Sequence, residues 1–153
     1  MFLNATQQLD ILPMGLADLD DVYQLEVRCH SHPWTKKLFL SNFGHRYFSH
    51  VLLADNNVIG YFVASSVAGE VTLMNIAIAP EHQGQGMGRL LLQFLKNFAK
   101  KNDQQEIWLE VRASNENALA AYKKSDFVEV DLRKNYYPSD NGREDAVIMC
   151  CYL

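Results

Sequence analysis

A glycine-rich loop that leads directly into a long amphipathic helix constrains this sequence more than any other feature. Residues 80–89 read Pro-Glu-His-Gln-Gly-Gln-Gly-Met-Gly-Arg, so Gly84, Gly86 and Gly88 leave the backbone amides of the loop unshielded. The residues after the loop follow helical spacing, with one apolar face made of Leu90, Leu91, Phe94, Leu95 and Phe98. Unpaired N–H groups and the helix dipole favour an anion at such a helix N-terminus. The loop therefore predicts a phosphate site, and a pyrophosphate would suit it.

Two other kinds of glycine-rich site fit the loop less well. A Rossmann fingerprint requires Gly-x-Gly-x-x-Gly, but Arg89 occupies the position of the last glycine. A P-loop requires Gly-Lys-Ser/Thr, which the sequence lacks. A glycine turn that merely caps the helix stays open as an alternative.

The remaining pattern predicts one α+β domain that spans residues 1–153, with one βαβ crossover in the middle. Asp55-Asn56-Asn57 between two strand-like runs indicates a hairpin, and Thr35 is a candidate N-cap. The predicted strands include residues 10–12, 51–54, 58–63, 71–78, 107–111, 127–130 and 146–149. The predicted helices are residues 16–26, a short stretch after Thr35, the stretch after the glycine loop, and residues 115–124.

Composition and charge exclude several classes of protein. The chain is 48% hydrophobic, enough for a core, yet no run approaches the ~20 apolar residues of a membrane span. Residues 1–6 show no basic start followed by an apolar run, so we expect no secretory signal and a cytoplasmic location. The net charge of −4 argues against nucleic-acid binding but permits a cationic substrate. The helix acids Asp18, Asp20, Asp21 and Glu26 are expected on a solvated face.

The cysteines and histidines do not predict a metal site. Cys29, Cys150 and Cys151 lack the spacing of zinc ligands or of a disulfide framework, and the last two end an apolar run. They are expected to be buried or edge thiols, although a catalytic cysteine paired with His30 or His32 stays open. No ligand spacing relates the histidines to carboxylates or cysteines, so we expect packing or surface roles for His30, His32, His45, His50 and His82.

Several motifs together resemble the GNAT superfamily of N-acetyltransferases. Gln83, Gly86 and Gly88 fill the pattern Gln/Arg-x-x-Gly-x-Gly/Ala, the coenzyme A signature of that superfamily. Asn75–Pro80 resembles the strand before the loop, and Leu109–Asn115 with Ala118 and Tyr122 resembles the next strand and helix. The likeness is greatest to the RimI-type ribosomal-protein alanine N-acetyltransferases, through His32–Trp34, Arg133–Pro138, Glu144–Ala146 and Met149. It extends from about Leu25 to Met149.

The resemblance implies a fold and a donor substrate. The implied fold is a single mixed, mostly antiparallel central sheet, splayed in the middle, with helices on both faces. The implied donor is acetyl-CoA, with no metal. The residues expected to bind it are Ile76, Ala77, Ile78, Gln83, Gly84, Gln85, Gly86, Met87, Gly88, Arg89, Asn115 and Tyr122.

The resemblance also implies the catalytic residues. Glu110 is the expected general base, acting through water, and Tyr122 the expected acid for the departing thiolate. Each has a plainer interpretation: Glu110 as an ion-paired surface residue, Tyr122 as a packed aromatic, and Asn115 as a helix N-cap. Asp126-Phe127 stands where the family usually has Gly-Phe, so we expect Asp126 in a left-handed turn at a local cost.

The pKa of the acceptor favours an N-terminal amine. At neutral pH an α-amine, with a pKa near 8, loses its proton for about 1 kcal/mol, whereas lysine requires nearly 5 kcal/mol. By resemblance the leading acceptor is the N-terminal alanine of a ribosomal protein, and we expect a monomer with no membrane or nucleic-acid partner. The residues expected to contact the acceptor are Trp34, Asn75, Tyr136 and Tyr137, with core packing as the alternative for the aromatic rings. Lysine, polyamine or antibiotic acceptors, or a non-catalytic coenzyme-binding module, stay open.

Overall fold

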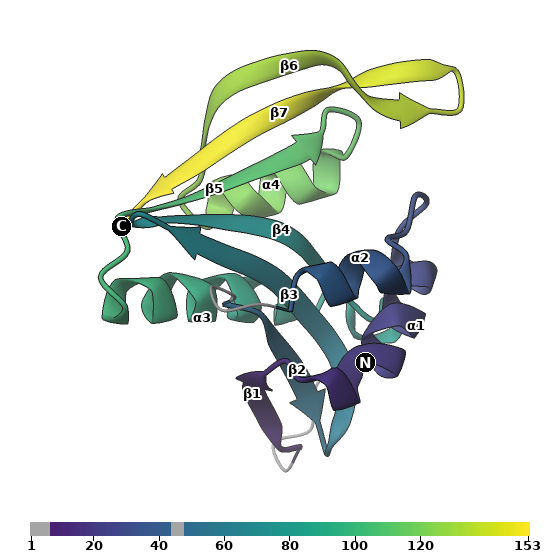
Figure 1. Cartoon of the computed structure of the whole chain (residues 1–153), viewed down its shortest axis with the longest axis vertical. Helices are drawn as coiled ribbons and strands as arrows, with labels where there is room; N and C mark the ends of the chain where they lie inside the picture. The colour runs from purple at the N-terminus through teal and green to yellow at the C-terminus, as the bar shows by residue number, and fades with distance from the viewer. Residues whose placement is uncertain (1–6, 44–47) are drawn as a thin grey trace.

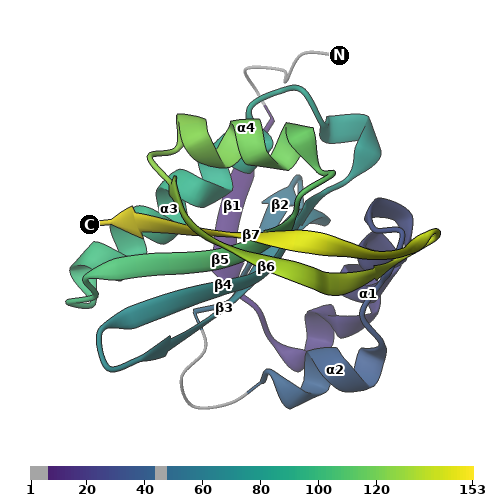
Figure 2. The ribbon, with the colours of Figure 1, turned by 90° about the horizontal axis from the view of Figure 1, so that it is seen from above.

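The computed structural model describes residues 7–43 and 48–153, which form one sheet with helices on both of its faces (Figures 1 and 2). The strands are β1 (Leu9–Pro13), β2 (His50–Ala54), β3 (Asn57–Val67), β4 (Glu70–Ile78), β5 (Glu106–Arg112), β6 (Val128–Ser139) and β7 (Gly142–Tyr152). The α-helices are α1 (Leu19–Cys29), α2 (Lys36–Ser41), α3 (Met87–Lys101) and α4 (Glu116–Lys124). Short 3-10 turns precede α1 at Leu16–Asp18 and α3 at Pro80–His82.

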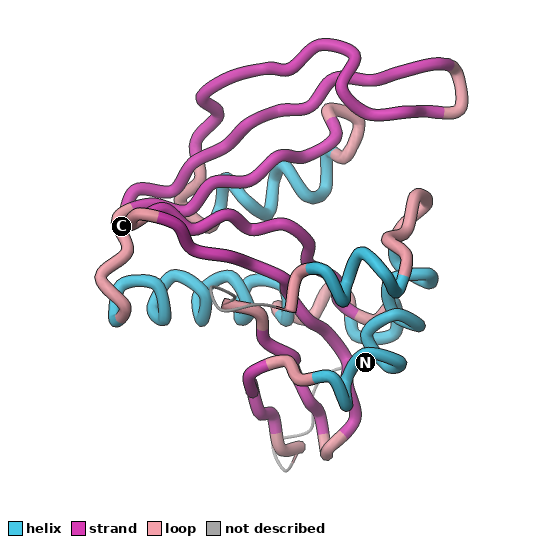
Figure 3. The backbone as a smooth tube through the Cα atoms, viewed as in Figure 1, coloured by secondary structure: helices cyan, strands magenta, loops and turns pink. Residues whose placement is uncertain are grey.

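The sheet splits between its two central strands. The strand order is β1-β2-β3-β4-β5-β7-β6, and only β4 and β5 are parallel neighbours. Their pairing begins at Glu70–Glu106 and ends at Leu73–Leu109, whereas β5 stays paired with β7 as far as Arg112. Beyond that point β4 and β5 diverge, as the backbone in Figure 3 shows. The predicted fold, a mostly antiparallel sheet splayed in the middle, is confirmed.

The C-terminal strands are much longer than the sequence pattern indicated. We expected residues 127–130 and 146–149, but β6 has 12 residues and β7 has 11. Their outer halves form a two-stranded arm beyond the edge of β5, and Asn135 (φ 55°) interrupts its regular pairing. In a strand with one buried face, apolar and polar residues alternate, and the exposed outer parts of β6 and β7 lack this pattern. A second crossover, from β5 through α4 to β6, was also missed. These two strands are not neighbours, because β7 lies between them in the sheet.

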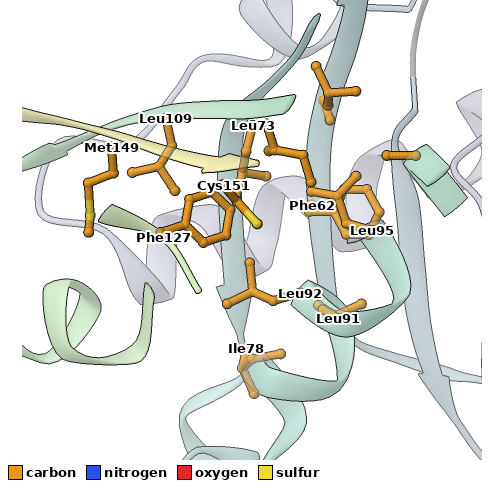
Figure 4. Packing of buried hydrophobic residues seen from close by; sticks show 14 of the residues in the cluster. Phe62, Leu73, Ile78, Leu91, Leu92, Leu95, Leu109, Phe127, Met149 and Cys151 are labelled. Atoms are coloured by element: carbon orange, nitrogen blue, oxygen red, sulfur yellow. The ribbon is translucent and has the colours of Figure 1, made fainter. Parts of the chain in front are cut away.

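Two hydrophobic cores lie on opposite faces of the sheet. Successive residues of β3 alternate between them: Phe62 packs in the cluster beneath α3, and Tyr61 in the cluster beneath α1 and α2. Figure 4 shows the first cluster, where Leu91, Leu92 and Leu95 of α3 meet Phe62 and Leu73. Leu91 and Leu95 of the predicted face therefore anchor the glycine loop to the sheet, whereas Leu90 is 37% exposed and Leu92 packs in its place.

Local predictions about turns and caps are confirmed. The Thr35 hydroxyl accepts a hydrogen bond from the Leu38 amide (3.1 Å), which caps α2. Asp55 and Asn56 both have positive φ in the β2–β3 turn. Asp126 adopts the expected left-handed backbone (φ 72°), and its carboxylate is 2.7 Å from Nζ of Lys96 on α3.

Candidate active site

The glycine loop lines a cavity of about 540 Å³ between α3 and α4. Gly86 is the N-cap of α3 with φ +82°, and Gly84 has φ +75°. A Cβ atom added at either glycine would meet nothing within 4 Å, so both face open space. Of the residues predicted to bind acetyl-CoA, seven line this cavity: Ile78, Gln83, Gly84, Gly86, Met87, Gly88 and Arg89. Gln85 is not among them, since its side-chain amide turns back to the Glu81 carbonyl (3.5 Å).

The glutamine of the family signature has a structural contact. Gln83 Nε2 donates to the carbonyl oxygen of Ile78 (2.9 Å), which fastens the loop to the end of β4. Side chains of α4 that were not predicted to bind the coenzyme complete the cavity wall: Asn117, Ala120, Ala121 and Lys124. Their spacing places them on one helix face, a signal that was available in the sequence. Arg89, at the end of the loop, and Lys124 of α4 supply the cationic side chains of this cavity.

A second cavity, of about 270 Å³, continues from the loop into the split of the sheet. It shares Gln83 and Gly88 with the first cavity and extends to Ile76 and Tyr122. The Ala79 amide donates to the carbonyl oxygen of Ile59 on β3 (2.7 Å). Because the backbone groups of successive residues in a strand point to opposite sides, those of Ile76 and Ile78 point away from β3. These groups face the split, where β5 no longer pairs with them.

A third cavity, of about 290 Å³, contains both predicted catalytic side chains. Glu110 lies on β5 one residue beyond the last β4–β5 pair, and Oε1 of its carboxylate is 3.3 Å from the Arg133 guanidinium of β6. Tyr122 comes from α4 and packs against Phe127, with ring centroids 5.8 Å apart. Burial raises the pKa of Tyr122 to about 12, so its phenol keeps its proton at ordinary pH.

The loop between α1 and α2 and the β6–β7 arm form the remaining walls. Trp34 and Tyr137 line the third cavity and also a neighbouring one of about 440 Å³, which residues of β4, β5, β6 and β7 line as well. Arg112 holds the arm in place: it donates to the Pro138 carbonyl (2.7 Å) and stacks 4.5 Å from the Tyr137 ring centre. It also pairs with Glu144 at 2.9 Å.

The other predicted acceptor and coenzyme residues take different positions. Asn75 lines the third cavity. Tyr136 lines none of the cavities, is 41% exposed and lies beneath the Arg133 guanidinium. Asn115 caps α4 by accepting from the Ala118 amide (3.2 Å), and it also lines the third cavity. Both interpretations of Asn115 are therefore compatible with its position.

The cysteines are buried or partly buried and unlinked, as expected. Cys29 lines the second and third cavities, and its thiol donates to the Ile78 carbonyl (3.3 Å). Burial raises the pKa of this thiol, which disfavours the thiolate that a nucleophile requires. The open possibility of a catalytic Cys29 therefore has little chemical support.

One prediction about the acidic residues of α1 was wrong. Asp20 and Asp21 are exposed, but Glu26 is 1% exposed and lines the third cavity. Its carboxylate accepts hydrogen bonds from the Trp34 amide, the Tyr61 hydroxyl and the Asn75 amide group. The helix turns this position inward because polar donors from three separate segments converge on it, which no local pattern reveals.

Within residues 7–43 and 48–153, no three His, Cys, Asp or Glu side chains are grouped as metal ligands would be. His50 packs among Phe62, Phe94 and Phe98, and its burial lowers its pKa. His45 lies outside the described residues. No helix in the described part of the chain is long and apolar enough to cross a membrane.

Comparison with known proteins agrees with this geometry. The model of the acetyltransferase (GNAT) family matches residues 19–127. The [ribosomal protein bS18]-alanine N-acetyltransferase of Escherichia coli K12 is 44% identical over 139 residues, which cover 91% of this chain and 94% of that protein. The enzyme of the same name from Haemophilus influenzae is 45% identical over 137 residues, covering 89% and 93%. The crystal structure of the ribosomal-protein-S18-alanine N-acetyltransferase from Escherichia coli superposes with a TM-score of 0.92, at 40% identity and 95% and 94% coverage. With the split sheet, the glycine loop and these matches together, the chain belongs to the GNAT family of acetyltransferases.

Proposed function

We propose that this enzyme transfers the acetyl group of acetyl-CoA to the N-terminal α-amine of a protein. The leading acceptor is the N-terminal alanine of ribosomal protein bS18, the residue for which the similar enzymes are named. The observation that carries the proposal is the run of cavities through the split sheet, from the glycine loop to Glu110 and Tyr122. Residues 1–153 would act as one domain, as a cytoplasmic monomer with no metal.

The phosphates of the donor fit the first cavity. The amides at residues 84–89 would donate to the pyrophosphate, where the start of α3 favours negative charge. Arg89 and Lys124 would add the cationic partners. The backbone groups of Ile76 and the N–H of Ile78, which face the split, would pair with the amide-containing arm of the coenzyme, as a neighbouring strand would.

The catalytic groups then act on the acyl carbon. Glu110, through a water molecule, takes the proton that the amine must lose before its nitrogen lone pair attacks the thioester carbonyl. A backbone N–H of β4 stabilises the oxyanion that forms, and the carbon–sulfur bond breaks as the carbonyl returns. Tyr122 gives its proton to the departing thiolate, and the second proton that the acylated nitrogen must lose passes through water to the phenolate and restores it.

The raised pKa of Tyr122 affects this last step. A phenol with a pKa of about 12 is a weak acid for an ordinary thiolate, whose conjugate acid has a pKa near 8.5. Cys29, which lines the same channel, shows that burial there raises the pKa of a thiol as well. A coenzyme thiolate desolvated in the same channel would be a stronger base than in water, which would limit the energetic cost of the proton transfer.

Acetylation rates with several different amine acceptors test this function. We expect a peptide with a free N-terminal alanine to be acetylated at neutral pH with a kcat/KM at least about a hundredfold above that of the same peptide with a blocked N-terminus and one lysine. Spermidine should be equally poor. We expect the alanine peptide to react faster because a larger fraction of an α-amine than of a lysine amine is neutral at that pH. Initial rates measured by release of free thiol give the comparison, and equal rates for the blocked lysine peptide would identify a side-chain acetyltransferase.

Changing the glycine loop should remove coenzyme binding. Gly86→Val places a β-branched side chain at φ +82° in the open space of the first cavity, where the phosphates would lie. We expect acetyl-CoA affinity, measured by calorimetry, to fall by at least about tenfold. Gly69→Val is the matched control, since Gly69 has φ +84° in the β3–β4 turn and lines none of these cavities. Unchanged affinity in Gly86→Val would place the phosphates elsewhere.

A further inference from the structure

The buried carboxylate of Glu26 joins the two elements that form the acceptor side of the third cavity. Its Oε2 accepts from the backbone amide of Trp34 (2.8 Å), which lies in the loop between α1 and α2. Its Oε1 accepts from Asn75 Nδ2 of β4 (2.7 Å) and from the hydroxyl of Tyr61 on β3. Burial and the Glu26 carboxylate raise the pKa of Tyr61, so this hydroxyl remains a donor. This 1% exposed carboxylate, with three donors and with His30 Nε2 3.5 Å from its Oε1, links α1, β3, β4 and the loop.

This arrangement fixes which way the Asn75 amide points. A carboxylate oxygen in this setting only accepts hydrogen bonds, so the Asn75 atom beside it must be the NH₂ group. The carbonyl oxygen of Asn75 is then the group left for a ligand in the third cavity, which Asn75 lines. A carbonyl oxygen accepts hydrogen bonds from the N–H groups of an amine, whereas an NH₂ group could bind only the lone pair with which the amine must attack.

The position of Asn75 in β4 brings it to this cavity. Val63 of β3 pairs with Asn75 and Ala64 pairs with Leu73, so Met74 is the extra residue of a β-bulge. Leu73 packs in the core beneath α3, whereas Met74 and Asn75 both line the third cavity. The bulge re-aims the strand at the point where β4 leaves β5.

The geometry points to Glu26 as a positioning residue for the acceptor amine: it orients the Asn75 amide, so that its carbonyl oxygen faces the amine, and it anchors the Trp34 loop. This assignment rests on the proposed N-terminal acetyltransferase function. Glu26 does not itself transfer a proton in it. Its effect is specific to the acceptor, because Glu26 lines neither the cavity at the glycine loop nor the channel beside it.

Glu26→Gln tests the assignment, because it keeps the size of the side chain and replaces one acceptor by a donor. The new NH₂ group lies against another hydrogen-bond donor, either the Trp34 amide or the Asn75 NH₂. In the first case the Trp34 loop loses its anchor, and in the second the Asn75 amide turns over. We expect the KM for the alanine peptide to rise by about tenfold or more, with kcat and the KM for acetyl-CoA within about twofold of wild type. An unchanged peptide KM, or an equal rise in both KM values, would overturn the assignment.

Two further variants separate positioning from general packing. Tyr61→Phe removes another donor to the same carboxylate but leaves its bonds to Trp34 and Asn75, so it should lower the melting temperature with the peptide KM within about twofold. Glu26→Gln combined with Asn75→Asp exchanges amide and carboxylate, so the peptide KM should return to within about threefold of wild type. Failure of this rescue would count against the assignment.

The remaining outcomes are also decisive. If Glu26→Gln does not fold, Asn75→Ala removes the same carbonyl oxygen from the cavity wall, and an unchanged peptide KM in that variant overturns the assignment. A wild-type enzyme that prefers another amine would refute the proposed function alone. The KM comparison is then made with that amine, so the two failures remain distinguishable.

Discussion

Tyr122→Phe is expected to lower kcat by about a hundredfold or more, while the KM values for acetyl-CoA and peptide change by less than about threefold. The phenol donates its proton only as the thiolate leaves, so the ground-state complex should hardly respond to its loss. The ring itself remains, and with it the packing against Phe127. Steady-state kinetics at saturating acetyl-CoA measure the effect.

The matched control for this variant is Tyr152→Phe. Tyr152 ends β7, is 65% exposed and lines none of the cavities, so loss of its hydroxyl should leave kcat unchanged. If Tyr122→Phe turns over as fast as the wild type, Tyr122 is a packing residue and water protonates the thiolate.

Glu110→Gln is expected to lower kcat/KM for the alanine peptide by about a hundredfold or more near neutral pH. The glutamine keeps the size of the side chain and cannot accept the proton. Activity should recover in part above about pH 8, because the α-amine is then already neutral. The wild-type rate should also rise with pH over the same range but less steeply, so the ratio of the wild-type rate to the variant rate should shrink as pH increases.

Glu106→Gln provides the comparison for Glu110→Gln. Glu106 lies on the same strand, at the end where β4 and β5 are paired, and it lines none of the cavities. It should have wild-type activity. A fully active Glu110→Gln enzyme would mean that another group removes the proton. Glu144 is poorly suited, since hydrogen bonds from Ser114 and Arg112 hold its carboxylate and lower its pKa.

Periodicity and loop chemistry predicted most of the scaffold. The apolar face of α3, the hairpin turn at Asp55 and the glycine loop are local patterns, and their structural consequences are local as well. The Asp126 turn followed from the same kind of reasoning. Each of these features depends on residues that lie close together in the sequence, so a single sequence contains the necessary information.

The features that were missed depend on contacts between distant segments. Glu26 reads as one more acid of an exposed helix, and only the meeting of Trp34, Tyr61 and Asn75 explains its burial. The pairing of Glu110 with Arg133 on the arm depends on how far β6 and β7 extend. Neither distance nor orientation across the split sheet can be read from the spacing of residues along the chain.

Locating the acetyl group on one peptide is the most direct test of the proposed N-terminal acetyltransferase function. A peptide with a free N-terminal alanine and an internal lysine is incubated with the enzyme and acetyl-CoA at neutral pH, then fragmented by tandem mass spectrometry. We expect a single acetyl group on the α-nitrogen of the alanine and an unmodified lysine. An acetyl group on the lysine side chain, with the N-terminus free, would contradict this function.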